Sequence, residues 1–200
     1  MFAADELQRI APPVFFWQAW SPEVKAELGS TAIVVRGGLV LVDPIPLVPA
    51  LFEELTAEFP PLAIVLTNDN HERHSRALAE RLNLPRYAHP AAGGGKGGML
   101  ALGEGEVLFE AVRVIELPGA APGEVALLVE DAGLLVIGDA LINMASTGFT
   151  RLPAKYCTDP RQLDESLKKL LAFSFEMMTF AHGLPIPHQA KRQLQSVLTS

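Results

Sequence analysis

The stretch Ile64-Val-Leu-Thr-Asn-Asp-Asn-His-Glu-Arg-His74 decides how this chain is interpreted. The apolar run from Leu62 to Leu66 has the character of a buried strand. The polar residues from Thr67 onward predict a loop, and the spacing of apolar residues in 75–82 predicts a helix. In open α/β sheets, functional sites form at the carboxyl ends of strands. The polar loop therefore lies where a site is expected.

The composition is that of a folded protein and has few features that favour nucleic-acid binding. The chain has 200 residues, 49% of them apolar, so we expect a single domain over residues 1–200. A formal charge of −7 without a basic cluster argues against nucleic acid and membrane partners. The single cysteine, Cys157, excludes an intramolecular disulfide. We expect no signal peptide and no membrane span, and hence a cytoplasmic location.

Runs of strand and helix character alternate along the chain. Gly37-Gly38 separates two β-branched-rich runs, 31–36 and 39–42, and predicts a hairpin. Further strands are predicted at 85–89, 106–109, 112–115, 125–129, 134–137 and 177–180. Further helices are predicted at 51–59, 159–170 and 188–198, the second of which begins with Asp159-Pro160. This order predicts two mixed or mainly antiparallel sheets covered by helices.

Residues 91–98 form a glycine-rich run, Ala-Ala-Gly-Gly-Gly-Lys-Gly-Gly. The run lacks the Gly-Lys-Ser/Thr ending of a phosphate loop, and no amphipathic helix follows it. We interpret it as a flexible surface loop rather than as a phosphate-binding loop.

Five motifs between Phe16 and Pro185 resemble those of the metallo-β-lactamase superfamily. They are Leu39-Val-Leu-Val-Asp43-Pro44, Thr67-Asn-Asp-Asn-His-Glu-Arg73, Leu117-Pro-Gly-Ala-Ala-Pro-Gly123, Leu134-Leu-Val-Ile-Gly-Asp139 and Ala181-His-Gly183. At these positions the family has an aspartate that closes a strand, Thr-His-x-His-x-Asp-His, Pro-Gly-His-Thr-Pro-Gly, Gly-Asp and Gly-His-Gly. The resemblance implies an α/β (α+β) fold, a four-layer αβ/βα sandwich of metallo-β-lactamase type.

The resemblance also implies a binuclear metal site, but most of its ligands are replaced in this sequence. Only Asp139 and His182 match the family pattern. The replacements are Asn68 and Asn70 for two histidines, Glu72 for the aspartate, Arg73 for a third histidine and Ala120 for a fourth. Zinc requires three or four donors such as imidazole, thiolate or carboxylate, and a neutral amide oxygen is a weak ligand. Standard binuclear zinc hydrolysis is therefore not expected.

Arg73 is the replacement with the largest chemical consequence. Its permanent charge cannot coordinate a metal ion and would repel one. It is instead expected to pair with Asp139 or Glu72 and to replace the metal as the local cation. Two interpretations of Asp139 remain open. It is either a remaining metal ligand or acid/base group, or a carboxylate that pairs with Arg73 or accepts hydrogen bonds from turn amides. For His182 we favour a metal ligand or proton shuttle.

Three further residues lie close to these motifs. His71 and His74 are three residues apart, and one of them would complete a shifted mononuclear site with the two remaining ligands. We favour exposed positions for both, because the family position of His71 is variable and points away from the metals. Asp43 is expected to have a structural role, accepting hydrogen bonds from residues 68–70.

Two classes of function are compatible with this sequence. The family resemblance implies a metal-dependent hydrolase, here an atypical ester or lactone hydrolase using one divalent ion (Zn, Mn or Fe) or none. Asp139 and His182 are its candidate catalytic residues and, with His71, its candidate metal ligands. The alternative is an inactive pseudo-enzyme that binds an unidentified small molecule or associates with itself. The aromatic segment from Phe15 to Trp20 is a candidate contact surface for a homo-oligomer.

Overall fold

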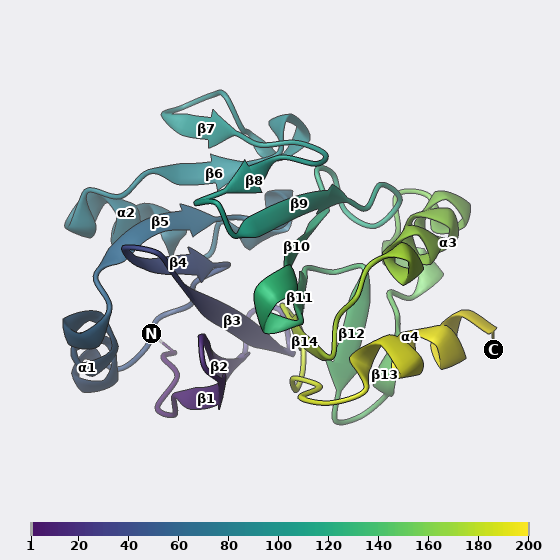
Figure 1. Cartoon of the computed structure of the whole chain (residues 1–200), viewed down its shortest axis with the longest axis horizontal. Coiled ribbons are helices and arrows are strands. Elements are labelled where there is room, and N and C mark those ends of the chain that lie inside the picture. Colours follow the sequence, from purple (N-terminus) through teal and green to yellow (C-terminus); the bar gives the residue numbers. More distant parts are fainter. Residues whose placement is uncertain (1, 200) are drawn as a thin grey trace.

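Two large sheets form the centre of the structure, a computed structural model that describes residues 2–199 (Figure 1). The first sheet has 7 strands in sequence order. Strands β1 to β4 are antiparallel, whereas β4 to β7 are parallel. The strands are β1 (Gln8–Ala11), β2 (Val14–Ser21), β3 (Ala26–Val35), β4 (Gly38–Val42), β5 (Pro61–Val65), β6 (Arg86–Ala88) and β7 (Met99–Ala101).

The second sheet has 5 strands in the order β14-β11-β10-β9-β8. It is antiparallel except for the pair β11 and β14. Its strands are β8 (Val107–Leu108), β9 (Val112–Glu116), β10 (Val125–Val129), β11 (Leu134–Ile137) and β14 (Met177–Phe180). A separate hairpin, β12 (Leu141–Met144) with β13 (Gly148–Arg151), follows β11. The expectation of two mixed or mainly antiparallel sheets is therefore confirmed.

Helices cover the outer faces of both sheets (Figure 1). They are α1 (Pro49–Glu58), α2 (Ser75–Leu82), α3 (Pro160–Lys169) and α4 (Ala190–Thr199). The predicted start of α3 is confirmed, because the Asp159 side chain accepts hydrogen bonds from the amides of Arg161 and Gln162. Strands β1, β7, β12 and β13 were not predicted; β1, β7 and the β12–β13 pair lie at sheet edges or outside the two large sheets.

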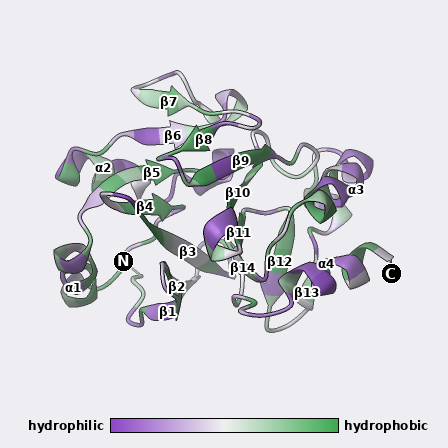
Figure 2. Ribbon diagram, in the orientation of Figure 1, coloured by the Kyte–Doolittle hydropathy of each residue, from purple (hydrophilic) through white to green (hydrophobic). Residues whose placement is uncertain are grey.

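Alternation of side chains along the strands divides the core into layers. In β4, Val40 and Val42 pack between the two sheets, whereas Leu39 and Leu41 pack under α1 and α2. In the second sheet, Leu128 faces outward to the apolar side chains of α3 and α4. Figure 2 shows the same division, with hydrophobic strands inside and polar outer faces on the helices. The predicted four-layer sandwich is confirmed.

The aromatic segment near the start of the chain belongs mainly to this core. Phe16 and Trp17 of β2 are 0% and 1% exposed, and Phe15 is also buried. Trp20 is 56% exposed. The prediction that the segment forms a contact surface is wrong for three of its rings, because Phe15 and Trp17 belong to the core cluster under the first sheet and Phe16 is fully buried.

The carboxyl ends of four strands meet at one edge of the sandwich. Val42 of β4 pairs with Val65 of β5, so Asp43 and the loop after β5 emerge together. Ile137 of β11 pairs with Phe180 of β14, so Asp139 and His182 also emerge together. Thr31 of β3 donates a hydrogen bond to Thr179 of β14 at 2.9 Å and joins the two sheets near this edge.

No helix within residues 2–199 combines the length and the apolar character needed to cross a bilayer.

Candidate metal centre

The loop after β5 directs the His71 side chain into the protein interior. Asn68 is extended, and its Oδ1 accepts a hydrogen bond from the Asn70 amide, which starts a short 3₁₀ turn at Asp69–His71. This turn leaves His71 only 2% exposed. The expected exposed position of His71 is therefore wrong. His74 is half-buried and immediately precedes α2, close to the expected helix-start position.

Two histidines meet at a single carboxylate oxygen. The Nε2 atoms of His71 and His182 each lie 3.2 Å from Oδ1 of Asp139. One ligand atom from each of these three residues lies within 4.8 Å of the other two. The buried Nε2 of His71 has no aligned hydrogen-bond partner. The structure thus brings together Asp139, His182 and His71, the three candidate metal ligands named from the sequence.

The Nδ1 atom of each imidazole contacts a protein oxygen that orients the ring. His71 Nδ1 lies 2.9 Å from Asp43 Oδ2 and 2.8 Å from Thr67 Oγ1. His182 Nδ1 donates a hydrogen bond of 3.0 Å to the Glu27 carbonyl. A proton on Nδ1 leaves the lone pair on Nε2, which is the arrangement found in most metal-binding histidines.

Asp43 contacts the loop after β5 through other partners than expected. It accepts hydrogen bonds from the Thr67 amide at 2.9 Å, from the Thr67 hydroxyl and from His71, but none from residues 68–70. Burial alone would raise the pKa of Asp43, but the adjacent His71 lowers it below its ordinary value. Its backbone is left-handed, with φ of 47°, an uncommon conformation for a residue other than glycine.

The carboxylates of Asp43 and Asp139 favour the protonated form of His71. Burial and Arg73 both lower its pKa, but Asp43 and Asp139 outweigh them and raise it to about 9. Burial likewise raises the pKa of Asp139, yet His71 and His182 hold it well below its usual range. The raised pKa favours an imidazolium form of His71, which lies between the two carboxylates.

Glu124 is a buried site residue that the sequence analysis missed. It is 2% exposed and accepts hydrogen bonds from Asn68 Nδ2 at 2.7 Å and from the Ala140 amide at 2.9 Å. Burial and the charge of Asp139 raise its pKa to about 8. The available signal was its position directly after Gly123, where an acidic residue opens the apolar strand β10.

Asn68 connects Glu124 to Asp139, one of the three candidate metal ligands. Its Nδ2 donates to Glu124 Oε2 and also to Oδ2 of Asp139 at 3.1 Å. Asn68 therefore acts through hydrogen bonds and fixes the orientation of the Asp139 carboxylate.

Arg73 binds backbone carbonyls rather than carboxylates. Its Nη1 donates to the carbonyls of Gly29 at 2.7 Å and Asp43 at 3.2 Å, and its Nη2 donates to that of Ala181 at 3.2 Å. The predicted ion pair with Asp139 or Glu72 is wrong, because the Arg73 donors bind a carbonyl within β3 and the carbonyls directly after β4 and β14. Arg73 joins the site loop to both sheets.

The remaining predicted pocket residues lie apart from the three ligands. Glu72 is exposed and pairs with Arg86 at 3.0 Å. Ala120 is fully buried in the apolar core beside α3. Their predicted place in the pocket is wrong. Asn70 is exposed and lines the rim of the cavity above His71.

A cavity of about 610 Å³ opens onto the three candidate ligands. Its polar lining residues include Arg73, His74 and the candidate ligands. Its apolar lining residues are Phe2, Val24, Leu28, Ile45 and Pro46. The cavity thus combines donor atoms with apolar surface, a common composition for small-molecule sites.

Comparisons with known proteins agree with this architecture. A sequence profile described as the metallo-beta-lactamase superfamily matches residues 6–200. The chain therefore belongs to the metallo-β-lactamase superfamily, as the sequence motifs indicated. The comparison with curated protein sequences gave no match.

Solved structures of this superfamily superpose closely on the chain. The DIM-1 metallo-beta-lactamase has a TM-score of 0.78 at 14% identity, covering 97% of this chain and 96% of that one. A metallo-beta-lactamase from Erythrobacter litoralis has a TM-score of 0.73 at 14% identity, covering 100% and 98%. TTHA1623, solved in a di-iron-bound form, has a TM-score of 0.63 at 26% identity, covering 84% and 92%.

Proposed function

We propose that this protein is a hydrolase-type member of the superfamily that uses one divalent metal ion. The observation that carries the proposal is the meeting of His71 Nε2 and His182 Nε2 at Asp139 Oδ1, each 3.2 Å away. Three protein ligands with a remaining open position are typical of catalytic zinc, and two histidines with one carboxylate also suit iron(II).

The chemistry of the donor set fits one metal ion. Both imidazoles are already oriented through Nδ1, and the buried Nε2 of His71 lacks an aligned partner. The charge of Arg73 opposes a cation in the site, so we expect weaker binding than a site without it would have. The side chains of Asn68, Ala120 and Arg73 are all engaged elsewhere or lack a donor atom, so a second metal ion is not part of the proposal.

A bound divalent ion would lower the pKa of a coordinated water and polarise a carbonyl group. Asp43 orients the His71 ring, and Asn68 holds Oδ2 of Asp139 while Oδ1 faces the two histidines. The lining also includes apolar side chains such as Leu28 and Ile45, which can contact an apolar part of a ligand. These features support a small ester or lactone with an apolar part as the substrate class.

The second candidate is a pseudo-enzyme that binds a small molecule without turnover. The observation that favours it is the charge network of the metal-free protein. His71, with its pKa raised to about 9, forms a cation between Asp43 and Asp139 and meets their charge without a metal. In that case a small molecule in the same cavity would contact a protonated His71.

Metal content separates the two candidates. Untagged protein would be incubated with Zn²⁺, Mn²⁺ or Fe²⁺, dialysed and examined by elemental analysis. We expect about one equivalent in the wild type and loss of the metal in Asp139→Ala and His182→Ala. His89→Ala is the matched control, because His89 pairs with Glu116 outside the cavity.

Activity on a panel of esters and lactones completes the test. Hydrolysis that requires the bound metal and disappears in His182→Ala supports the first candidate. No retained metal together with no turnover contradicts it, and stoichiometric ligand binding under those conditions supports the second.

A further inference from the structure

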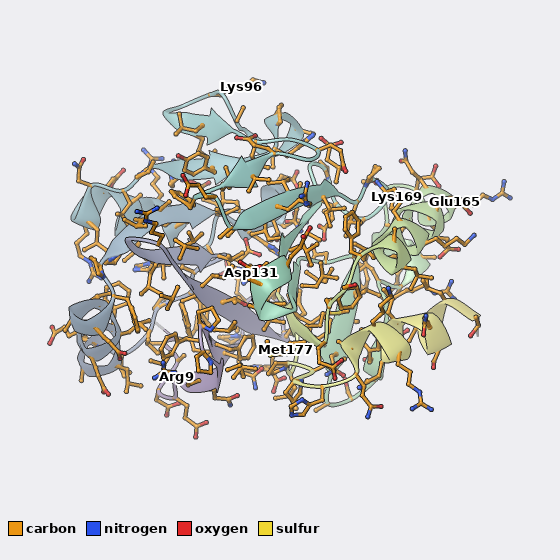
Figure 3. The ribbon with its side chains drawn as sticks, viewed as in Figure 1. Arg9, Lys96, Asp131, Glu165, Lys169 and Met177 are labelled. Carbon is orange, nitrogen blue, oxygen red and sulfur yellow. The ribbon has the colours of Figure 1, made fainter. Side chains whose placement is uncertain are left out.

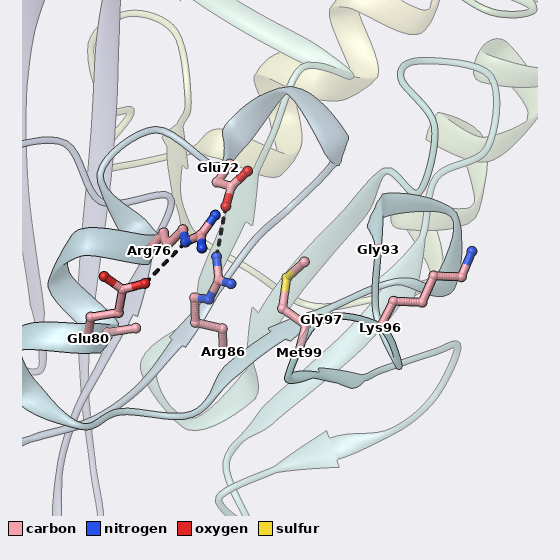
Figure 4. A pocket seen from close by; sticks show the side chains of 9 residues that line it. Glu72, Arg76, Glu80, Arg86, Gly93, Lys96, Gly97 and Met99 are labelled. Carbon is pink, nitrogen blue, oxygen red and sulfur yellow. Dashed lines mark hydrogen bonds and ion pairs between the residues drawn. The ribbon is translucent and has the colours of Figure 1, made fainter.

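A second cavity, of about 470 Å³, lies beside α2, β6 and the glycine-rich loop (Figure 4). Glu72 lines it, whereas the neighbouring His71 lines the cavity of the candidate metal centre. Three basic and two acidic side chains surround it, so its charge is positive in a chain whose formal charge is −7. The basic residues are Arg76, Arg86 and Lys96, and the acidic residues are Glu72 and Glu80.

Arg86 is the least solvated charge in this cavity. Its side chain is only 13% exposed, and its Nη1 donates to Glu72 at 3.0 Å. Within residues 2–199 the structure gives its Nε and Nη2 groups no protein partner. A guanidinium group largely withdrawn from water, with donors left over, favours an anion that accepts several hydrogen bonds.

Arg76 adds a second guanidinium group to the same cavity (Figure 4). Its ion pair with Glu80 is an exposed pair on α2, with side chains 72% and 70% exposed. Such pairs contribute little to stability, so Arg76 can exchange this partner for a ligand at small cost. Lys96 stands at the tip of the glycine-rich loop (Figure 3), and its amine points away from the two arginines in Figure 4. The Lys96 amine therefore attracts an anion electrostatically from a distance and does not contact it directly.

The glycine-rich loop was expected to be a flexible surface loop that does not bind phosphate, but backbone hydrogen bonds close it into a turn and leave two of its amides without a partner among the described residues. Gly95 donates to the Met99 carbonyl at 2.9 Å, and Lys96 donates to the Gly93 carbonyl at 3.1 Å. Gly97 and Gly98 are left-handed, with φ of 55° and 80° and open space around them. Their amides donate to no group in the described part of the chain. Successive amides of this kind form concave surfaces that bind anions.

We propose that this cavity binds a small organic phosphate. The phosphoryl oxygens would accept hydrogen bonds from Arg86, Arg76 and the Gly97 amide, which come from three different elements. A phosphoryl group has more acceptor oxygens than a carboxylate and matches this spread of donors better. The cavity is larger than a phosphate ion alone, and Ala79 and Met99 provide an apolar surface for the organic part. The proposal does not depend on the function proposed for the metal centre.

Isothermal titration with ribose 5-phosphate tests this site in full-length protein treated with EDTA, so that a bound metal cannot hold the phosphate. Ribose is the neutral comparison and ribonate is the carboxylate comparison. We expect ribose 5-phosphate to bind, ribonate to bind more weakly and ribose not to bind. Arg86→Gln should weaken binding about tenfold or more, because a charge-assisted hydrogen bond is lost. Arg113→Gln, at a half-exposed arginine paired with Glu130, should leave it unchanged.

Three results would overturn the proposal: no binding of ribose 5-phosphate to the wild type, equal affinity in Arg86→Gln and Arg113→Gln, or equal affinity for ribonate. Because Arg86 is nearly buried, its variant is first checked for folding by circular dichroism. If it does not fold, Arg76→Gln takes its place, since Arg76 is exposed. Unchanged phosphate binding in that variant also contradicts the site.

Discussion

His71 Nδ1 lies 2.9 Å from Oδ2 of Asp43, a residue 28 positions earlier in the chain. The contact joins the loop after β5 to the end of β4 and directs the Nε2 of the same ring towards Asp139. A carboxylate behind a histidine fixes both the tautomer and the direction of the ring. The candidate metal centre therefore depends on Asp43, although Asp43 itself is not among its ligands.

The first prediction concerns this contact. Asp43→Asn should weaken metal binding about 10- to 100-fold, because the His71 ring loses its charged partner. Competition with a chelator of known affinity measures the change. Asp164→Asn, in a partly exposed ion pair with Arg151, is the control and should keep wild-type affinity. Equal metal affinity in the two variants would show that Asp43 does not position His71.

The stability of the metal-free protein should decrease as the pH rises above neutrality. The pKa of His71 is raised to about 9, so its contribution is complete below about 6.5 and is lost as the pH passes through about 9. The pKa of Glu124, raised to about 8, acts in the same direction, because the folded protein keeps a proton that the unfolded chain releases above about 4.5. Urea unfolding with EDTA at several pH values between 6 and 10 measures the effect.

Glu124→Gln provides the control for this pH dependence. It removes one of the two titrating groups with little change in shape, so the decrease should become smaller but should remain. A free energy of unfolding that rises between neutral pH and pH 9 in the wild type would contradict the assignment of both groups.

Arg73→Gln should change stability and metal affinity in opposite directions. The variant loses hydrogen bonds to one carbonyl within β3 and to the carbonyls directly after β4 and β14, which should lower the free energy of unfolding by about 1–3 kcal/mol. The same change removes a positive charge close to Asp139 and should strengthen metal binding. Urea unfolding and chelator competition measure the two effects. Parallel changes in both would mean that the Arg73 charge does not act on the site.

Glu124→Ala should destabilise the protein even without any metal. The amide of Ala140 and the Nδ2 of Asn68 would each lose a buried acceptor, at a cost of about 1–3 kcal/mol for each group left unsatisfied. Glu130→Ala, at an exposed residue, is the matched control. If both variants unfold at the same urea concentration, the buried hydrogen bonds of Glu124 contribute nothing measurable.

Gly138→Ala should disturb the site directly. A Cβ atom at Gly138 would lie 2.6 Å from Thr67 Oγ1 and 2.7 Å from Glu124 Oε1, closer than these atoms can approach without a shift. We expect lower stability and weaker metal binding, measured by thermal unfolding and chelator competition. Gly103→Ala is the control, because its Cβ would lie 3.6 Å from the nearest atom, the flexible Glu116 carboxylate. Wild-type behaviour of Gly138→Ala would contradict this close packing.

The fold was largely predictable because its signals are local. Apolar alternation and a glycine pair predicted the hairpin of β3 and β4, and Asp159-Pro160 predicted the start of α3. The same apolar patterns predicted where the strands end. Asp139 and His182 were predicted to meet because each follows a strand in the family order, and the structure brings them to 3.2 Å.

The side-chain partners in the site were less predictable. His71 turns inward through a single 3₁₀ turn, which sequence periodicity does not register. Arg73 takes as acceptors carbonyls 44, 30 and 108 positions away, so no local pattern identifies them. Glu124 reaches Asn68 across 56 positions. These partners depend on which strand ends become neighbours in the folded chain.

The contacts of Arg73 have a consequence for how the centre responds to metal loss. A metal ion that holds strand ends together can dissociate, and the strand ends are then free to separate. The guanidinium group is covalently attached, so the clamp on Gly29, Asp43 and Ala181 persists when the solution contains a chelator. We therefore expect the candidate ligands to keep their positions with and without a bound metal ion, so that binding or release of a metal ion would not require the fold to open.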